Sequence, residues 1–469
     1  MGTAGGLDYV PRDRILGASR AVPPADYLAI RAALDQDQTD RKMMFFRGDE
    51  GIPCHVQISL MPWFLTDAQR DYFRRYYMAV DEATRLLYPF ARANADAARL
   101  LPVSEGLARW MRDCIGDPVP HQTFIGRIDA SVRWFDADWK DSFRLIETNM
   151  VGIGAAYYSY AAGQAARERL GSRYASLGGR LENEDDILEL IQRQVISHGE
   201  AIGLRRFHVG WTQDDRVQGG PEEYHIVCDI LRGRGYHARV TDPRDLVVRD
   251  GQLWHADWPV DLLYRDPTVD DLLEMEAEGA DLTAVKWAFK NNRVVSSLLG
   301  EYDHKAALEL FTWPSFQKLM SPESRDLLVR HTAWTRVVRE TRTTALDGRE
   351  VDLLPWIREN RAKLLLKPNR DYGGHGLVFG EEVDSARWDA AVAEALADDA
   401  STVVQEVIPP VKLPFPRVVE GRVQFDDMFI VSGFTGTPRG VAMLARMSLG
   451  RIVNITRDGG IAGVLVPRG

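Results

Sequence analysis

The sequence is poor in cysteine and has no long apolar run. Its three cysteines, Cys54, Cys114 and Cys228, lie far apart and form no Cys-x-x-Cys pair, so neither a disulfide framework nor a zinc site is expected. No uninterrupted apolar segment approaches the length of a membrane-spanning helix, and the first residues lack the apolar core of a secretion signal. These absences make a reducing cytoplasm the expected compartment.

Positive charge is not in excess either. The 58 lysine and arginine residues are outnumbered by 68 aspartate and glutamate residues, which gives a formal net charge of −10 at pH 7. This balance argues against a general binder of nucleic acid or of a membrane surface. With 469 residues, 45% of them hydrophobic and 27% charged, the chain is expected to be a globular protein of several structural units.

Hydrophobic periodicity divides the chain into four parts. The first is helical, the second opens with a β-hairpin and continues as helices, the third alternates strands with helices, and the fourth ends in a β-rich segment. Alternation of strands and helices is typical of a parallel, Rossmann-like α/β unit. The predicted fold class is therefore a mixture of α+β and α/β. The four parts are residues 1–120, 121–205, 206–300 and 301–469.

Capping signals predict several helix ends. Thr66-Asp67-Ala68-Gln69 has capping-box spacing and starts a long helix, which Pro89 is expected to kink or end. Asn183 is the predicted cap of a later helix, and Ser321-Pro322 is the predicted start of a helix that reaches about residue 340. The aromatic residues along the first of these helices are interpreted as core rather than as a cofactor site.

Residues 363–380, KLLLKPNRDYGGHGLVFG, place a glycine-dense turn between two apolar runs. The pattern predicts a β-hairpin with a long tip. Gly373, Gly374 and Gly376 would let backbone N–H groups approach an anion closely, and Lys367 adds a point charge for phosphate. Taken alone, these residues fit a phosphate-binding loop and an ordinary hairpin turn equally well.

A second hairpin carries polar residues that are unusual for strands. Arg127 and Asp129 lie two apart on its first strand, and Glu147 and Asn149 lie two apart on its return strand. Residues two apart point to the same face, so one face is expected to present two carboxylates, an amide oxygen and a guanidinium. Such oxygen ligands suit Mg²⁺, and the arginine would neutralise a transferring phosphoryl group. The alternative is a solvated hairpin face with arginine–carboxylate pairs.

Three further segments carry weaker signals. Lys305 begins a helix and could equally be a solvated lysine. Gln405, Glu406 and Val407 end a strand just before a double proline, where an adenine would meet the backbone and a ribose would meet a carboxylate. Arg446 and Arg451 stand among short C-terminal strands and could equally be surface residues.

The order of these motifs resembles that of ATP-grasp enzymes, in which two antiparallel sheets hold ATP between them. The matching residues are Lys305, then Lys367-Pro368 with the glycine-rich turn, then Val404-Gln405-Glu406. The Arg-x-Asp and Glu-x-Asn pairs resemble the magnesium motif of that superfamily, which in most members stands at the C-terminal end. Here the motif lies at residues 127–149, before the lysines, and Ile452-Val453-Asn454 lacks a glutamate two residues before its asparagine.

This departure resembles the circularly permuted branch of the superfamily, which includes glutathionylspermidine synthase-like and glutathione synthetase-like ligases. Residues 258–265, WPVDLLYR, also resemble the VDxxYR strand of permuted ATP-grasp proteins, and the whole resemblance spans residues 121–469. The resemblance implies that Asp129, Glu147 and Asn149 hold Mg²⁺ and that Arg127 contacts the γ-phosphate or acyl-phosphate. It also implies that Lys305 and Lys367 contact ATP phosphates under a lid formed by residues 373–376. Gln405, Glu406 and Val407 would then line the adenine and ribose site, and Arg446 and Asn454 would contact phosphate or substrate.

The resemblance implies an ATP- and Mg²⁺-dependent carboxylate–amine ligase that makes an amide bond through an acyl-phosphate. A free carboxylate is a poor acyl donor because its leaving group is poor, and phosphorylation gives an intermediate that an amine can attack. Small-molecule carboxylate and amine substrates are the expected partners, without nucleic acid or membrane, and a homodimer stays open. Two alternatives remain: an ATP-grasp enzyme that phosphorylates its substrate without an amine acceptor, and a non-catalytic protein that keeps the fold.

Overall fold

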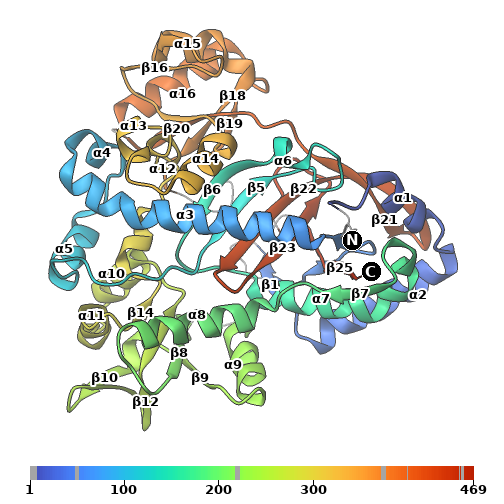
Figure 1. Cartoon of the computed structure of the whole chain (residues 1–469), viewed down its shortest axis with the longest axis horizontal. Coiled ribbons are helices and arrows are strands. Elements are labelled where there is room, and N and C mark those ends of the chain that lie inside the picture. The colour runs from blue at the N-terminus through green and yellow to red at the C-terminus, as the bar shows by residue number, and fades with distance from the viewer. Residues whose placement is uncertain are drawn as a thin grey trace, which may run out of the picture.

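The computed structural model describes residues 8–47, 52–216, 222–370, 376–398, 400–453, 455 and 459–468. Figure 1 shows a central sheet crossed by the long helix α3 (Asp67–Ala93), with a small lobe above it and a parallel-sheet lobe below it. Both chain ends lie at the right of this view, beside the central sheet. None of the helices in the described ranges is long and apolar enough to cross a membrane.

The central sheet has seven strands, which run in the order β3-β24-β23-β22-β5-β6, and β21 is also paired to β22. Near its edge, a strand from the first part of the chain pairs in parallel with one from the last part, Ile58 lying opposite Ile461. A second such pairing occurs in a three-stranded sheet of order β4-β25-β7, where β4 from the first part of the chain pairs in parallel with β25 from the last part. The strands are β3 (Gln57–Ile58), β4 (Trp63–Phe64), β5 (Arg127–Ser131), β6 (Arg144–Asn149), β7 (Arg180–Asn183), β21 (Lys412–Val419), β22 (Arg422–Thr437), β23 (Gly440–Ser448), β24 (Gly460–Ala462) and β25 (Val464–Arg468).

The predicted hairpin of residues 123–150 is confirmed as β5 and β6, with shorter strands than expected and the short helix α6 (Trp139–Ser142) in the connection. The antiparallel register places Arg127 opposite Asn149 and Asp129 opposite Glu147. A β-bulge after Asp129 shifts the register of the rest of the ladder. All four polar side chains therefore belong to one end of the hairpin.

Helix α3 fixes the position of β5 against the sheet. The Tyr77 hydroxyl accepts a hydrogen bond from Gly126 N at 2.9 Å and donates one to Gly126 O at 3.1 Å, directly before the strand begins. Phe73 packs on Phe434 of β22 with ring centroids 4.5 Å apart. Because both contacts come from one buried face of the helix, the polar end of β5 is anchored to the core.

The small lobe contains a four-stranded antiparallel sheet in the order β15-β20-β18-β19. The predicted hairpin of residues 363–380 is confirmed, because β18 pairs with β19 and places Leu366 opposite Val378. Gly373 and Gly374, at its tip, lie outside the described residues. The lobe has a core of its own that includes Trp334, Trp356 and Trp388. Its elements are β15 (Thr335–Val337), β16 (Arg342–Thr344), β17 (Glu350–Asp352), α15 (Leu353–Glu359), β18 (Leu364–Pro368), β19 (Val378–Phe379), α16 (Ser385–Ala397) and β20 (Thr402–Glu406).

The third lobe holds a four-stranded sheet in the order β14-β13-β8-β9, and every neighbouring pair in it is parallel. A three-stranded antiparallel sheet of β10, β11 and β12 stands beside it. The alternation of strands and helices expected for this stretch is thus present. Its elements are β8 (His208–Thr212), α9 (Glu223–Gly233), β9 (His237–Thr241), β10 (Leu246–Arg249), β11 (Gln252–His255), β12 (Trp258–Val260), β13 (Leu262–Arg265), α10 (Val269–Ala277), α11 (Thr283–Lys290) and β14 (Val294–Val295).

Capping predictions had mixed outcomes. The capping box is confirmed, because Thr66 Oγ1 accepts from Gln69 N at 3.3 Å and Gln69 Oε1 accepts from Thr66 N at 3.1 Å. Pro89 does not end the helix, since α3 continues through it to Ala93, and burial of Leu87 and Phe90 on either side offsets the lost hydrogen bond.

Two predicted helix ends were wrong. Asn183 ends strand β7, where it pairs with β25, and Asp186 caps α8 (Ile187–Ala201) by accepting from Leu188 N at 3.0 Å. The helix α14 (Pro322–His331) stops well before residue 340, because the chain then turns into β15 to pair with β20. The remaining elements are α1 (Arg12–Arg20), α2 (Pro24–Asp40), β1 (Met44–Arg47), β2 (Ile52–His55), α4 (Ala95–Leu100), α5 (Glu105–Cys114), α7 (Ala156–Leu170), α12 (Ala307–Leu310) and α13 (Pro314–Gln317).

Candidate active site

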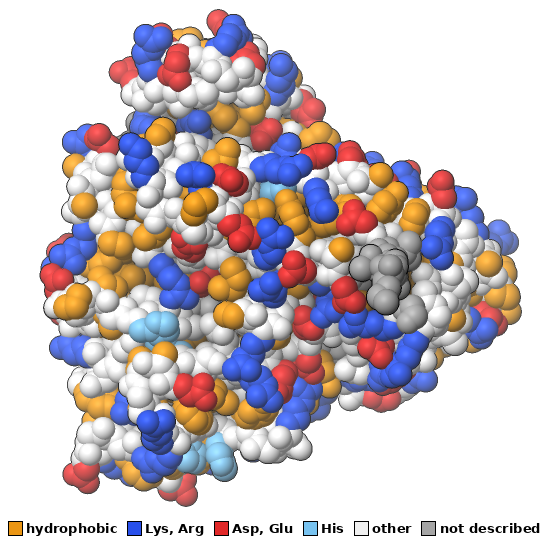
Figure 2. Space-filling view, in the orientation of Figure 1, with side chains coloured by type: hydrophobic (Ala, Val, Ile, Leu, Met, Phe, Trp, Pro, Cys, Tyr) orange, Lys and Arg blue, Asp and Glu red, His pale blue; other side chains and the backbone are white. Residues whose placement is uncertain are grey.

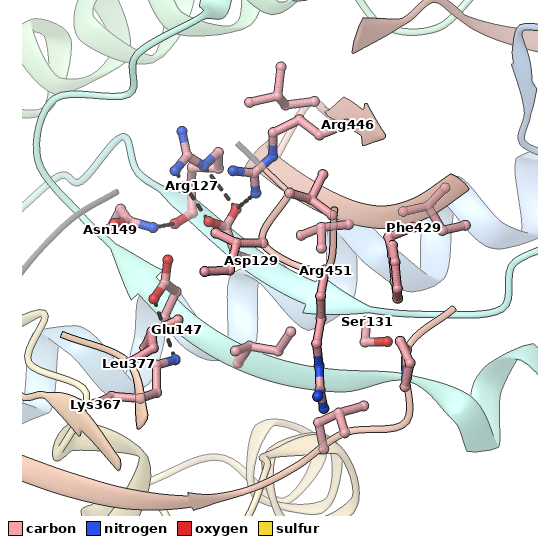
Figure 3. Close-up of a pocket in the computed structure, with 18 of the residues that line it drawn as sticks. Arg127, Asp129, Ser131, Glu147, Asn149, Lys367, Leu377, Phe429, Arg446 and Arg451 are labelled. Atoms are coloured by element: carbon pink, nitrogen blue, oxygen red, sulfur yellow. Dashed lines mark hydrogen bonds and ion pairs between the residues drawn. The ribbon is translucent and has the colours of Figure 1, made fainter. Parts of the chain in front are cut away.

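A cavity of about 530 Å³ lies between the central sheet and the sheet of the small lobe. Side chains of β5, β6, β22 and β23 line it from one sheet, and side chains of β18, β19 and β20 line it from the other. Figure 3 shows the polar part of this cavity, with Arg127, Asp129 and Arg446 on the central sheet and Lys367 reaching in from the small lobe. On the molecular face of Figure 2, acidic and basic side chains are interspersed.

Asp129 is held by two arginines. Arg127 donates from Nε to Oδ1 at 2.9 Å and from Nη2 to Oδ2 at 3.2 Å, and Arg446 Nη2 lies 2.8 Å from Oδ1 (Figure 3). Burial alone would raise the pKa of Asp129, but the two guanidinium groups outweigh it and lower the pKa to about 2. Asp129 is therefore ionised throughout the physiological pH range.

Gly433 makes room for the Arg127–Asp129 pair. It lies directly opposite Asp129 in the ladder between β22 and β5. A Cβ at this position would stand 2.8 Å from Arg127 Cδ and 3.0 Å from Asp129 Oδ1. A larger residue here would push both side chains away from their present positions, so the geometry of the pair depends on this glycine.

Glu147 faces two lysines from different parts of the chain. Its Oε2 lies 3.8 Å from Lys305 Nζ and 3.6 Å from Lys367 Nζ. Lys367 also donates to Gln405 Oε1 at 3.3 Å. Burial lowers the pKa of Lys367, partly offset by the Glu147 charge. Lys305 is 8% exposed, so the alternative of a solvated lysine was wrong.

The strand β20 closes the cavity at the small-lobe side. Gln405 Nε2 donates to Ile146 O at 3.0 Å and to Thr335 Oγ1 at 2.9 Å, which ties the two sheets together. Glu406 Oε1 accepts from Trp334 N at 2.8 Å, and burial raises the pKa of this carboxyl. Apolar residues that follow β20, namely Val407, Ile408 and Val411, line the cavity at this end. The rest of its apolar lining is formed by Ile146, Leu365, Leu377, Phe379, Phe429, Ile430, Val431, Leu444, Ile452, Val453 and Ile455.

Arg451 bridges the two sheets over this apolar end. Its Nη1 lies 2.5 Å from Glu381 Oε1 and 2.8 Å from Glu382 Oε1, just beyond β19. Its guanidinium carbon stands 4.1 Å from the centre of the Phe379 ring. At the hairpin itself, Gly376 has φ +64° and a Cβ there would meet Pro368 Cγ at 2.8 Å, so this turn requires glycine.

Another end of the cavity is formed by the start of helix α7, by the segment before it and by α9. We call it the α7 end and define it by Gly154, Ala155, Tyr158 and Glu223. Arg127 joins it to the charged centre of the cavity, because its Nη1 donates to Gly154 O at 3.5 Å. Glu223 is 8% exposed and its Oε1 accepts from Tyr157 N at 2.8 Å.

The donor set of this cavity fits Mg²⁺. The described ranges contain no group of three or more His, Cys, Asp or Glu side chains that could hold a metal alone. Asp129, Glu147 and Asn149 instead offer two carboxylates and one amide oxygen on neighbouring strands. Mg²⁺ is usually held in this way, by one or two carboxylates together with substrate phosphates, whose charge the four nearby cations would match.

The cavity brings together most of the residues singled out in the sequence. The residues that line it are Arg127, Asp129, Glu147, Asn149, Lys305, Lys367, Gln405, Glu406, Val407 and Arg446. Gly376 lies beside Pro368 at the rim, and Gly373, Gly374 and Asn454 fall outside the described residues. Arg446 is not a surface residue, since its side chain is 12% exposed.

One charged residue of the cavity, Glu223, was missed in the sequence, and a second, Arg451, was noted there without a role. Glu223 opens a helix of the parallel lobe, and its only sequence signal, an acidic residue in the first turn of a helix, is common on surfaces. Arg451 follows β23 in an irregular segment, and the glutamates that it contacts lie about 70 residues earlier. Neither contact leaves a local pattern.

Comparisons with known proteins agree with this architecture. No protein-family model matches the sequence. Uncharacterised proteins of Mycobacterium tuberculosis (strain H37Rv) and Mycobacterium bovis are 29% identical over 256 residues, which cover 51% of this chain and 44% of each relative. The chain thus spans less than half the length of these relatives. A solved structure of a glutathione synthetase-like effector from Globodera pallida aligns over 97% of this chain and 99% of its own, with a TM-score of 0.61 and 11% identity. The chain has a mixed α/β fold of the glutathione synthetase-like type.

Proposed function

We propose that the protein is an ATP- and Mg²⁺-dependent carboxylate–amine ligase of the circularly permuted ATP-grasp type, which forms an amide bond through an acyl-phosphate. One observation carries this proposal. Two carboxylates and an amide on the central sheet face four cations, contributed by both sheets and by the Lys305 segment, inside one cavity. The fold likeness to a glutathione synthetase-like protein supports the same reaction class.

The residues divide the chemistry between them. Asp129, Glu147 and Asn149 would hold Mg²⁺, which when bound would neutralise charge on the ATP phosphates. Lys305 and Lys367, which now balance Glu147, would turn to the phosphates once the metal takes over that carboxylate. The apolar end beside Gln405, Glu406 and Val407 would take the nucleobase.

Arg127 stands where phosphoryl transfer would occur. It lies between Asp129 and Gly154, so its guanidinium can stabilise negative charge that develops as a substrate carboxylate oxygen attacks the γ-phosphorus. ADP leaves, and the acyl-phosphate that remains has a good leaving group. Attack by an amine on the acyl carbon then forms the C–N bond and releases phosphate.

The test is an ADP-release screen of small carboxylic acids against amines, with mass detection of the condensed product. We expect ADP release to require both an acid and an amine, and to be lost in Glu147→Ala and Lys367→Ala. Lys363→Ala, an exposed lysine at the start of the same hairpin, is the matched control. Unchanged turnover in the two cavity variants would contradict the site assignment. A stable phosphorylated product would favour a kinase-like reaction, and failure to bind Mg·ATP would favour a non-catalytic protein.

A further inference from the structure

The charged side chains of the cavity are not all balanced. Asp129 and Glu147 each face two cations, and Arg451 faces two carboxylates. Among the described residues, Glu406 and Glu223 are the cavity carboxylates without an ion pair. Each accepts a backbone N–H instead. Burying a carboxylate without a cation is unfavourable, so both positions are candidates for a contact with a ligand.

The two unpaired carboxylates lie at opposite ends of the cavity. Along β5, Arg127, Asp129 and Ser131 line the cavity in turn, and Figure 3 draws Arg127 at one side and Ser131, beside Phe429, at the other. Glu406 belongs to β20, in the sheet of the small lobe, where it accepts from Trp334 N. Glu223 belongs to the α7 end, which begins at the Arg127 guanidinium. Glu223 is therefore the unpaired carboxylate on the side where the acyl group would form.

We propose that Glu223 binds the ammonium group of the second substrate at the α7 end and accepts its proton before the amine attacks the acyl-phosphate. This inference rests on the proposed ligase function and names the residue that serves the amine. A carboxylate at this place complements a primary ammonium cation by charge, whereas the arginines and lysines at the cavity centre complement phosphate and the substrate acid.

The proton balance of this step is simple. One proton passes from the ammonium to the Glu223 carboxylate, and the freed lone pair forms the C–N bond to the acyl carbon. The C–O bond to phosphate breaks, and the departing phosphate carries the second proton that the nitrogen loses. Glu223 then releases its proton to water, which restores the carboxylate for the next turnover.

The surroundings of Glu223 suit a group that takes up and releases a proton. Burial raises its pKa to about 7, the Tyr157 and Ala155 N–H groups oppose this rise, and the nearby Asp266 charge adds to it. Asp266 itself accepts from the Tyr224 hydroxyl at 3.1 Å. The other titratable groups that feel the Glu223 charge are Tyr157, Tyr158, Tyr224 and Tyr264. All of these neighbours are carboxylic acids or phenols, whereas the adjoining centre of the cavity carries arginines and lysines.

A purely structural role for Glu223 makes a different prediction. Its Oε1 caps the N-terminus of α7 through Tyr157 N, and a glutamine side chain keeps that acceptor. Glu223→Gln would then leave every step of the reaction nearly unchanged. If Glu223 takes a proton, the same variant loses only reactions whose nucleophile arrives as an ammonium cation.

The experiment compares two nucleophiles of the same size, hydroxylamine and methylammonium, with the acid and the amine found by the ADP-release screen. Hydroxylamine is largely unprotonated at neutral pH and needs no base, whereas methylammonium and ordinary alkylamines do. We expect Glu223→Gln to keep hydroxamate formation within about twofold and to lower amide formation from the two protonated amines by about 100-fold, with recovery at high pH. Glu223→Asp, which keeps the charge, should retain part of the amide activity.

Glu222→Gln is the matched control, because Glu222 precedes Glu223, is exposed and pairs with Lys42. It should behave as wild type with all nucleophiles. Equal losses with hydroxylamine and with the amines, or no loss with either, would overturn the role of Glu223. Failure of the wild type to form a condensed product from any acid and nucleophile would instead refute the ligase function itself, so the two failures are distinguishable.

Discussion

Asp129 lies directly opposite Glu147 in the ladder between β5 and β6, yet the two carboxylates are balanced by different cations. Asp129 takes its partners from the central sheet, whereas Glu147 takes one lysine from the small lobe and one from the segment before α12. The ion pairs of Asp129 are therefore formed within a single sheet, whereas those of Glu147 depend on how the small lobe approaches the central sheet.

Replacement of Lys367 should weaken nucleotide binding. Its Nζ lies 3.6 Å from Glu147 Oε2 and 3.3 Å from Gln405 Oε1, at the place where phosphates would lie. Loss of a charged hydrogen bond is worth about 1.5–3 kcal/mol, so Lys367→Ala should raise the Kd for Mg·ATP roughly 10- to 100-fold. Isothermal titration calorimetry gives the value directly. Lys363→Ala should bind as the wild type does, and an equal loss in that variant would show that net charge alone is responsible.

A single methyl group at Gly433 should disturb the metal face. The added Cβ would stand 2.8 Å from Arg127 Cδ and 3.0 Å from Asp129 Oδ1, so the pair must move. We expect Gly433→Ala to lower the free energy of unfolding by about 1–3 kcal/mol and to weaken Mg·ATP binding at the same time. Urea denaturation and calorimetry measure the two effects.

Gly163→Ala serves as the control for that substitution, because a Cβ placed in this helical position has no atom within 4 Å apart from its chain neighbours and the backbone of its own helix. Alanine favours the helix, so this variant should gain about 0.5–1 kcal/mol and keep its nucleotide affinity. Normal binding by Gly433→Ala would show that the Arg127–Asp129 geometry does not matter for the nucleotide.

Arg451 should slow the release of nucleotide. It joins the segment after β23 to Glu381 and Glu382 beyond β19, and so holds the small-lobe hairpin against the central sheet. These partly exposed ion pairs are worth about 1 kcal/mol at most, so Arg451→Ala should speed nucleotide dissociation by up to about fivefold. Stopped-flow displacement of a fluorescent ATP analogue measures this rate. High salt should mimic the variant in the wild type, and Arg439→Ala, an exposed arginine after β22, should have no effect.

Stability should fall between pH 6.5 and pH 4 because of buried histidines. Burial lowers the pKa of His331 from 6.5 to about 4, because the folded protein favours the neutral imidazole. Its Nε2 lies 2.5 Å from the Tyr72 hydroxyl, and its Nδ1 lies 3.1 Å from Phe143 O. The stability that His331 contributes is fully present above pH 6.5 and is lost as pH falls through about 4.

His331→Gln should therefore flatten the pH dependence of the free energy of unfolding in this window by about 2 kcal/mol. Chemical denaturation at a series of pH values measures the slope. The exposed His225, which pairs with Asp215, provides the control, and His225→Gln should keep the slope of the wild type. An unchanged slope in His331→Gln would mean that other groups, such as His198, control the acid transition.

Local patterns in the sequence were enough to predict the elements that carry the site. The two-residue spacing of Arg127 with Asp129 and of Glu147 with Asn149 predicted one polar face, and the register of β5 and β6 confirms that face. The capping box at Thr66 was likewise predictable, because both of its partners lie within four residues. These features depend only on neighbours along the chain.

Contacts between distant segments were not predictable in this way. Asn183 looked like a helix cap, but pairing with β25, almost 300 residues later, makes it the end of a strand. Arg446 was recognised as a candidate for phosphate, whereas its partner in the structure is Asp129, more than 300 residues earlier. The carboxylate of Glu223 reaches the cavity only because the parallel lobe packs against the start of α7. No local signal records such packing.

The pairing of β3 with β24 and of β4 with β25 also has a consequence for synthesis on the ribosome. Strands near residue 60 wait for partners near residue 460, so the central sheet cannot be completed until nearly all of this sequence has left the exit tunnel. The parallel sheet of residues 208–295 needs no such partner and can form during elongation. The order of synthesis therefore favours the parallel sheet as the first unit to fold, and the central sheet closes last.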